Sequence, residues 1–157
     1  MSGETDLSQI RQAVRQLCDQ YGEDYWLQLD RDRGYPSEFV QELSEAGFLN
    51  ILIPEAYGGA GLGVIEASAV MEEVCRAGAH AGACHAQMYV MGSVLRHGNE
   101  AQKNRYLPEI ASGKLRLQSF GVTEPTTGTD TTSLKTVAKK DGDEYVINGQ
   151  KVWISRI

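Results

Sequence analysis

The sequence predicts an α+β fold, in which an amino-terminal α-helical bundle is followed by the first strands of an antiparallel β domain. As far as Gly113, apolar residues recur at the three- and four-residue spacing of amphipathic helices. After Gly113, β-branched and aromatic residues replace that spacing, and Asp141-Gly142 and Asn148-Gly149 are typical of tight turns between strands. We therefore expect a helical domain over residues 1–113 and an incomplete β domain over 114–157.

The first helix is predicted between Asp6 and Tyr21, with Asp6 as its N-cap and Gly22 just beyond its end. A second, shorter helix is predicted from Pro36 to Gly47, because proline suits a first helical turn and glycine a left-handed end.

The middle of the chain predicts a loop and three further helices. Residues 57–63 are too rich in glycine for a regular element, so we expect a loop there. Helices are predicted over 64–76, over 80–96, and from a cap at Asn99 through Tyr106, with Pro108 interrupting or redirecting the last of them.

Strands are predicted near 116–123, 134–140, 143–148 and 150–155. The last strand leads directly to Ile157, without the further strands that would close or cover a sheet. We therefore expect the chain to be the amino-terminal part of a longer protein.

Composition excludes several classes of function. The net charge of -6 and the lack of a basic stripe argue against nucleic acid binding, and no apolar run approaches the about 18 residues of a membrane span. Residues 1–6 resemble neither a secretion signal nor a transit peptide, which predicts the bacterial cytoplasm or, in a eukaryote, the mitochondrial matrix. The three cysteines include no Cys-x-x-Cys pair, which favours reduced thiols.

The segment from Phe120 to Thr131 carries the strongest chemical signal. Pro125 and Gly128 predict a turn, and several threonines surround it as hydrogen-bond donors. Gly128 would let a flat ring or a phosphate approach the backbone closely. The residues alone leave two interpretations open, a ligand-binding turn and a hydroxyl-rich surface turn.

Two motifs resemble those of the acyl-CoA dehydrogenase family. Residues 121–133 read GVTEPTTGTDTTS, which is similar to the first signature of that family, and residues 148–155 read NGQKVWIS, which is similar to its second flavin segment. Residues 53–59 and 98–103 agree more loosely with segments of its helical domain. Thr126, Thr127 and Thr129 depart from the commonest residues of the first signature.

The resemblance implies an FAD site. Thr123 and Ser155 match hydroxyls that hydrogen-bond the isoalloxazine ring, and Trp153 matches the indole that packs on it. Thr129 matches a position shared between the cofactor and the CoA thioester, so it is also a predicted substrate-binding residue. The full set of predicted cofactor-binding residues is Phe120, Val122, Thr123, Gly128, Thr129, Trp153, Ile154 and Ser155.

The resemblance also implies the reaction, the α,β-dehydrogenation of an acyl-CoA with hydride transfer to flavin N5. The implied acceptor is an electron-transfer flavoprotein, the implied parent is a homotetramer, and the acyl pocket would be lined by the helix near Cys84 to Leu95. The catalytic base of the family is a glutamate beyond Ile157, so we predict no catalytic residue in this chain. Glu124 belongs to the flavin turn and is not a candidate.

Other functions remain as alternatives. An acyl-CoA reductase or flavin oxidase of the same fold, or a non-catalytic helical interaction fragment, would fit the same pattern. The glycines of residues 58–63 lack the spacing of a nucleotide-binding loop, and Cys75, His80, Cys84 and His85 fit no standard zinc spacing, so no metal site is predicted.

Overall fold

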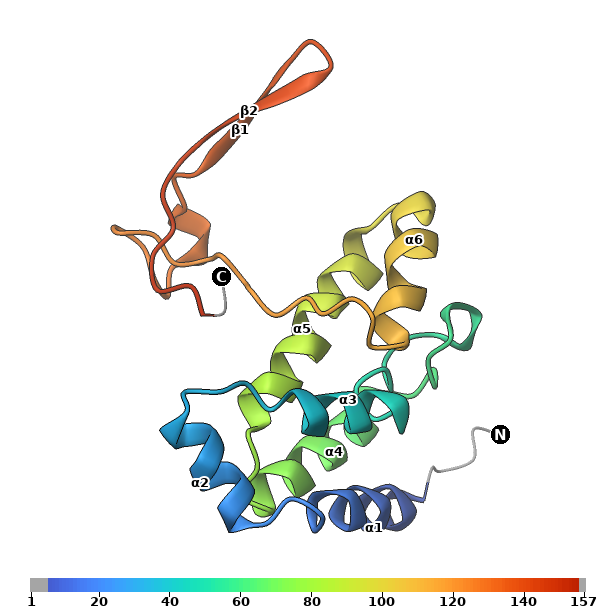
Figure 1. The fold of residues 1–157 in the computed structure, drawn as a ribbon. Coiled ribbons are helices and arrows are strands. Elements are labelled where there is room, and N and C mark those ends of the chain that lie inside the picture. The colour runs from blue at the N-terminus through green and yellow to red at the C-terminus, as the bar shows by residue number, and fades with distance from the viewer. Residues whose placement is uncertain (1–5, 156–157) are drawn as a thin grey trace. The chain divides into compact units, whose positions relative to one another are not determined.

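A computed structural model describes residues 6–155, which form two compact units that adjoin in sequence between Leu117 and Gln118 (Figure 1). The first unit is helical, and the second contains a short helix and an antiparallel hairpin. The predicted α+β fold class is confirmed. The elements are α1 (Leu7–Cys18), α2 (Glu23–Arg31), α3 (Ser37–Glu45), η1 (Glu55–Tyr57), α4 (Val64–Arg76), α5 (Ala81–His97), α6 (Glu100–Ala111), η2 (Thr131–Ser133), β1 (Val137–Asp141) and β2 (Glu144–Asn148).

The ends of several helices follow from their capping residues. The Asp6 carboxylate accepts a hydrogen bond from the Ser8 amide at 2.9 Å and so caps α1. Asn99 and Gln102 form a reciprocal capping box at the start of α6. Gly47 lies beyond α3 with a φ of 82°, the left-handed conformation expected of it. None of the helices within residues 6–155 is long and apolar enough to cross a membrane.

Two features of the helical unit differ from expectation. Helix α2 was not predicted, because it is short and mostly polar; none of its side chains is fully buried, although Tyr25 and Trp26 pack against the core. Pro108 was expected to interrupt α6, but the helix continues through it to Ala111. Proline removes a single helical hydrogen bond at this point, and burial of Leu107 and Ile110 on either side of it holds the backbone helical.

The loop before α4 depends on glycine at one position. A Cβ atom on Gly59 would lie 2.1 Å from the carbonyl oxygen of Ile53, a residue that is itself fully buried. The chain can therefore turn back over Ile53 only if residue 59 has no side chain. Gly58 and Gly61 have φ values of 83° and 63°, which confirms the irregular loop that their density predicted.

Replacing Gly59 with alanine should therefore destabilise the helical unit by about 1–3 kcal/mol, the usual cost of forcing extra atoms into a packed region. Urea unfolding followed by circular dichroism measures the change. Gly92→Ala is the matched control, because a Cβ at that position in α5 meets no atom within 4 Å. It should stabilise the unit by about 0.5–1 kcal/mol, and equal effects of the two substitutions would contradict this account of the loop.

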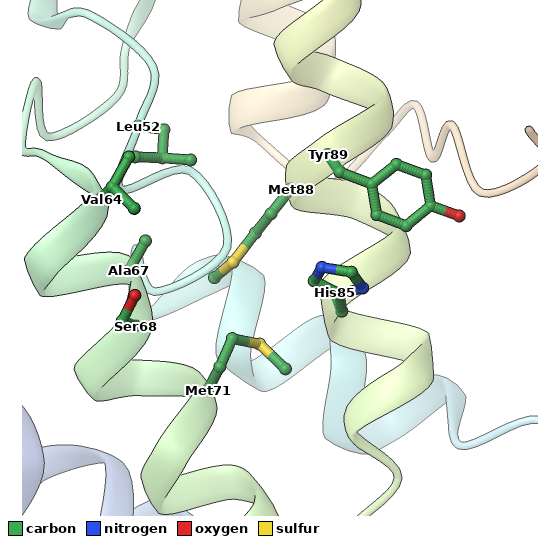
Figure 2. A pocket seen from close by; sticks show the side chains of 8 residues that line it. All are labelled: Leu52, Val64, Ala67, Ser68, Met71, His85, Met88 and Tyr89. Atoms are coloured by element: carbon green, nitrogen blue, oxygen red, sulfur yellow. The ribbon is translucent and has the colours of Figure 1, made fainter. Parts of the chain in front are cut away.

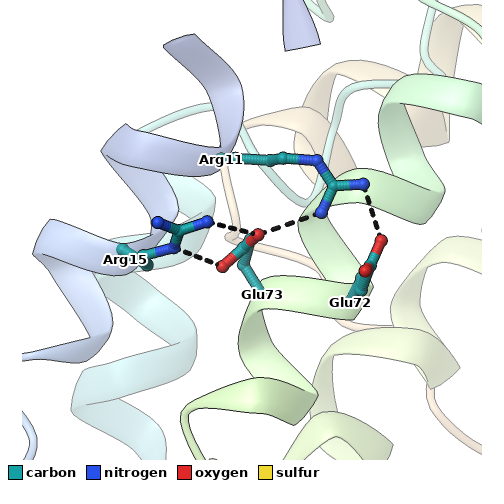
Figure 3. A network of polar contacts seen from close by, with 4 residues as sticks. All are labelled: Arg11, Arg15, Glu72 and Glu73. Atoms are coloured by element: carbon teal, nitrogen blue, oxygen red, sulfur yellow. Dashed lines mark hydrogen bonds and ion pairs between the residues drawn. The ribbon is translucent and has the colours of Figure 1, made fainter. Parts of the chain in front are cut away.

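A buried carboxylate joins α1 to α4 (Figure 3). The side chain of Glu73 is 1% exposed, and its two oxygens accept hydrogen bonds from Arg15 Nε at 2.6 Å and from Arg11 Nη1 at 2.9 Å. Hydrogen bonds from Arg15 and Arg11 lower the pKa of the Glu73 carboxyl from 4.5 to about 2. The second guanidinium nitrogen of Arg11 contacts Glu72, which is largely exposed.

This network predicts how the stability of the helical unit depends on pH. The pKa of Glu73 is lower in the folded chain than the ordinary 4.5, so its contribution is fully present above about pH 4.5 and is lost as the pH falls toward 2. Glu73→Gln should lower the free energy of unfolding at neutral pH and flatten its decline over that acid range. Urea unfolding at a series of pH values measures both effects.

Glu72→Gln is the control for this prediction, since it removes an exposed ion pair to the same Arg11. Such surface pairs contribute little, so the pH profile of this variant should follow that of the wild type. A Glu73→Gln profile as steep as the wild-type profile between pH 4.5 and 2 would show that Glu73 has no part in the acid response.

In the second unit, β1 and β2 pair in register from Val137 opposite Asn148 to Asp141 opposite Glu144. The predicted turn at Asp141-Gly142 is confirmed, and Gly142 has a φ of 59°. The predicted strands at 116–123 and 150–155 are wrong, because neither segment forms a ladder in the structure; a backbone hydrogen bond from Val152 N to Thr123 O at 2.9 Å links them. Consequently Asn148-Gly149 leads out of β2 and does not connect two strands.

Candidate functional site

A tight turn in the second unit forms the centre of the candidate site. The amide of Glu124 donates to the carbonyl of Thr127 at 2.9 Å, and the amide of Thr127 donates back at 3.1 Å. Pro125 therefore occupies the second position of a four-residue turn, where its fixed φ is favourable. The turn predicted from Pro125 is present, and the buried Thr127 hydroxyl contacts the carbonyl of Ser133 at 3.3 Å.

The Glu124 side chain points into the protein and is held there by donors from three residues. The Lys135 amide donates to Oε2 at 2.6 Å, while the Thr136 amide and Lys151 Nζ each donate to Oε1 at 2.9 Å. Hydrogen bonds from Thr136, from the Lys135 amide and from Lys151 lower the pKa of Glu124 to about 2. Glu124 is therefore ionised at neutral pH, but so low a pKa makes it a weak base, and its oxygens already accept three hydrogen bonds.

Lys151 connects the two predicted flavin segments. Its ammonium donates to the carbonyl of Val122 at 3.0 Å as well as to Glu124. The neighbouring amide of Val152 donates to Thr123 O at 2.9 Å. A Cβ on Gly121 would lie 3.7 Å from Cγ of Lys151 and 4.0 Å from Cδ1 of Ile154, so the two segments lie side by side.

The other predicted site residues are accessible from solvent. Trp153 is 90% exposed, an unusual state for the residue with the largest apolar side chain, and Phe120 is 48% exposed. Trp153 also has a φ of 61°, a left-handed conformation that non-glycine residues seldom adopt. A Cβ on Gly128 would meet no atom within 4 Å. Exposed or half-exposed hydroxyls lie at Thr123, Thr129 and Ser155.

This donor set fits a flavin. An isoalloxazine ring requires a flat apolar contact and hydrogen-bonding groups at its edges. The exposed Trp153 and Phe120 offer the apolar contact. Hydrogen-bonding groups are offered by the hydroxyls of Thr123, Thr129 and Ser155. Sequence reasoning assigned no role to Lys151, although its place in the Asn-Gly-x-Lys motif could have indicated one.

The helical unit contains an apolar groove of about 390 Å³ between α4 and α5 (Figure 2). Its α5 side consists of His85, Met88 and Tyr89, which fall within the helical stretch predicted for the acyl pocket. The α4 side was not predicted, because nothing in the helical spacing shows which neighbour faces α5. The residues that line the groove are Leu52, Val64, Ala67, Ser68, Met71, His85, Met88 and Tyr89.

His80 and Cys84 have structural contacts in the same unit. Nδ1 of His80 accepts a hydrogen bond from the Ala83 amide at 3.1 Å, so His80 caps the start of α5. Cys84 lies in the core with an exposure of 0%.

Comparison with known proteins defines the class. A sequence model of the acyl-CoA dehydrogenase N-terminal domain matches residues 4–114, and a model of the middle domain of the same enzymes matches residues 119–156. The chain belongs to the acyl-CoA dehydrogenase family.

Individual relatives agree with this placement. Acyl-CoA dehydrogenase FadE12 of Mycobacterium tuberculosis is 38% identical over 149 residues, which cover 94% of this chain and 38% of that protein. The mitochondrial isovaleryl-CoA dehydrogenase of Pongo abelii is 37% identical over 157 residues, covering 94% of this chain and 36% of that protein. The crystal structure of a glutaryl-CoA dehydrogenase from Mycobacterium smegmatis in complex with FADH2 has a TM-score of 0.84 at 29% identity and covers 96% of this chain and 39% of that one. The chain thus spans well under half the length of these relatives.

Proposed function

We propose that this chain carries part of the FAD site of an acyl-CoA dehydrogenase, without the base that begins the reaction. One observation carries the proposal: Lys151 and Val152 hydrogen-bond to Val122 and Thr123, which brings both motifs together beside the exposed Trp153. The FADH2 complex of a related glutaryl-CoA dehydrogenase supports FAD as the cofactor.

Each residue of the site has a proposed task toward FAD. Thr123 and Ser155 would hydrogen-bond the edge of the ring, and Trp153 would pack on its face. Phe120, Val122 and Ile154 would supply apolar and backbone contacts, while Gly128 leaves room for close approach. Thr129 would contact both the cofactor and the thioester. When bound, FAD supplies the acceptor for the β-hydrogen of an acyl-CoA as hydride.

We propose that the groove between α4 and α5 takes part in binding the acyl chain. Leu52, Val64, Ala67, Met71 and Met88 give it an apolar lining that suits a hydrocarbon. The two methionines can adapt to acyl groups of different shape, since an unbranched thioether side chain packs flexibly.

Partners and location of the whole protein follow as further proposals. An electron-transfer flavoprotein is the proposed acceptor, and a homotetramer the proposed assembly. The proposed location is the bacterial cytoplasm or, in a eukaryote, the mitochondrial matrix, which the mitochondrial relative supports. The prediction that no leader is present rests on residues 1–6, of which 1–5 lie outside the described part of the chain.

Anaerobic addition of a short acyl-CoA to the FAD-loaded chain tests the proposal. We expect the flavin absorbance to remain unbleached, because hydrogen bonds from its own chain occupy the oxygens of Glu124 and make it a weak base, and the chain supplies no other proposed base. Bleaching of the flavin, or turnover with an artificial acceptor, would show that a base is present after all. An oxidase or a dehydrogenase would bind FAD in this assay, whereas a non-catalytic interaction fragment would not.

A further inference from the structure

We propose that Glu124 and Lys151 are positioning residues, whose ion pair sets the main chain of residues 122–123 against residues 151–153 and thereby makes the flavin site competent. This inference rests on the proposed function. Neither residue is among those expected to contact FAD, and the pair acts through backbone atoms of residues that are.

The Glu124–Lys151 pair also reaches the main chain of Val122. A single ammonium, Lys151 Nζ, lies 2.9 Å from Glu124 Oε1 and 3.0 Å from the Val122 carbonyl. Removing Lys151 would release both contacts at once. Thr123, which directly follows Val122, would then keep the 2.9 Å bond from Val152 N, and the Ser119 hydroxyl would still donate to the Ser155 carbonyl at 3.2 Å.

The pair is largely shielded from solvent. The Glu124 side chain is 3% exposed and that of Lys151 is 27% exposed. Hydrogen bonds to charged groups shielded from water are stronger than those at the surface, and the loss of one partner leaves the other charge unpaired. The pair is therefore rigid enough to define where the backbone lies.

Glu124 also binds the chain that leads into β1. Its carboxylate also accepts the amides of Lys135 and Thr136, which directly precede β1 (Val137–Asp141). One buried carboxylate thus holds the turn, the chain entering the hairpin, and the Lys151 segment leaving it. Binding sites tolerate displacements of only about 0.5 Å, so loosening this carboxylate should disturb Thr123 and Trp153 together.

The test compares FAD binding and amide exchange in Glu124→Gln, Lys151→Met and the double variant. We expect each single substitution to raise the Kd for FAD by about tenfold or more, and to speed hydrogen exchange at the Val152 and Thr136 amides. Because the two residues act as one unit, the Kd for FAD of the double variant should be little higher than that of the weaker-binding single variant. The visible spectrum of flavin bound at saturation should also shift in the single variants.

Two controls separate positioning from general damage. Lys139→Met removes an exposed charge from β1 in the same unit and should leave the Kd unchanged. Glu73→Gln removes a buried, ion-paired carboxylate from the helical unit and should lower stability without changing the spectrum of the bound flavin.

A Lys151→Met variant with the Kd and Val152 exchange rate of Lys139→Met would overturn the inference. Additive effects in the double variant would overturn it as well. If the wild-type chain binds no FAD, the proposed function fails, and the exchange rates at Val152 and Thr136 still decide whether the pair holds the two segments.

Discussion

Replacing Trp153 with alanine is expected to raise the Kd for FAD by roughly 5- to 150-fold, because an aromatic stack is worth about 1–3 kcal/mol. The side chain is 90% exposed, so its loss should cost little or no folding stability. This separation of binding from stability is the signature expected of a residue placed for a ligand. Fluorescence titration with FAD, together with urea unfolding of the same sample, measures both quantities.

Tyr145→Ala is the matched control for this substitution. Tyr145 is an aromatic residue of the same unit and is 65% exposed, but it lies on β2 outside both motifs. Its removal should leave the Kd within about twofold of the wild type. Equal losses of affinity in the two variants would mean that the binding detected is non-specific contact with exposed aromatic rings.

Replacing Phe39 with alanine should destabilise the helical unit by about 3–5 kcal/mol. Phe39 is 0% exposed, and its ring lies 5.0 Å from that of Trp26 and 5.2 Å from that of Tyr21, both edge to face. The loss includes the cavity left behind and these aromatic contacts. The free energy of unfolding of a small domain is only about 5–15 kcal/mol. Much of the helical signal of this variant should therefore be lost at moderate urea concentrations.

Leu27→Ala is the control for the core prediction, because Leu27 lies on the neighbouring helix α2 and is 42% exposed. It should cost less than about 1 kcal/mol. If Phe39→Ala were no more damaging than Leu27→Ala, the aromatic cluster would not be part of the core that holds α2 and α3.

The helices were predictable where a buried stripe and a capping signal coincide. Helix α4 begins and ends at the predicted residues, and it buries Ala67, Val70 and Val74 at helical spacing. Helix α2 has acidic residues in its first turn and Arg31 in its last, but it is short and mostly polar, and Tyr25 and Trp26 are only partly buried against the core. The interruption predicted at Pro108 is wrong, because the low helix propensity of proline is a local preference that tertiary packing overrides.

The strand predictions failed for a related reason. Residues 116–123 and 150–155 have the β-branched and aromatic composition of strands, yet a strand exists only where a partner completes its ladder. Within residues 118–155 the hairpin supplies partners to β1 and β2 alone. The composition of a segment indicates its propensity for the extended conformation. Whether it forms a strand depends on which other segments lie beside it.

The two motifs of the candidate site could be located from sequence, but their connection could not. The pattern of residues 121–133 and 148–155 identifies the family, which the matches to both domains confirm. That Lys151 reaches both Val122 and Glu124 requires the path of the chain between them, which includes the hairpin. Likewise, the α5 side of the apolar groove could be predicted, whereas its α4 side depends on how the helices pack.

Titration of the wild-type chain with FAD tests the central claim most directly. We expect saturable binding at one site per chain, with a change in the visible spectrum of the flavin as it leaves water for the surroundings of Trp153 and Thr123. Absence of saturable binding by a chain whose helical signal shows it to be folded would contradict the claim that residues 120–155 carry a flavin site.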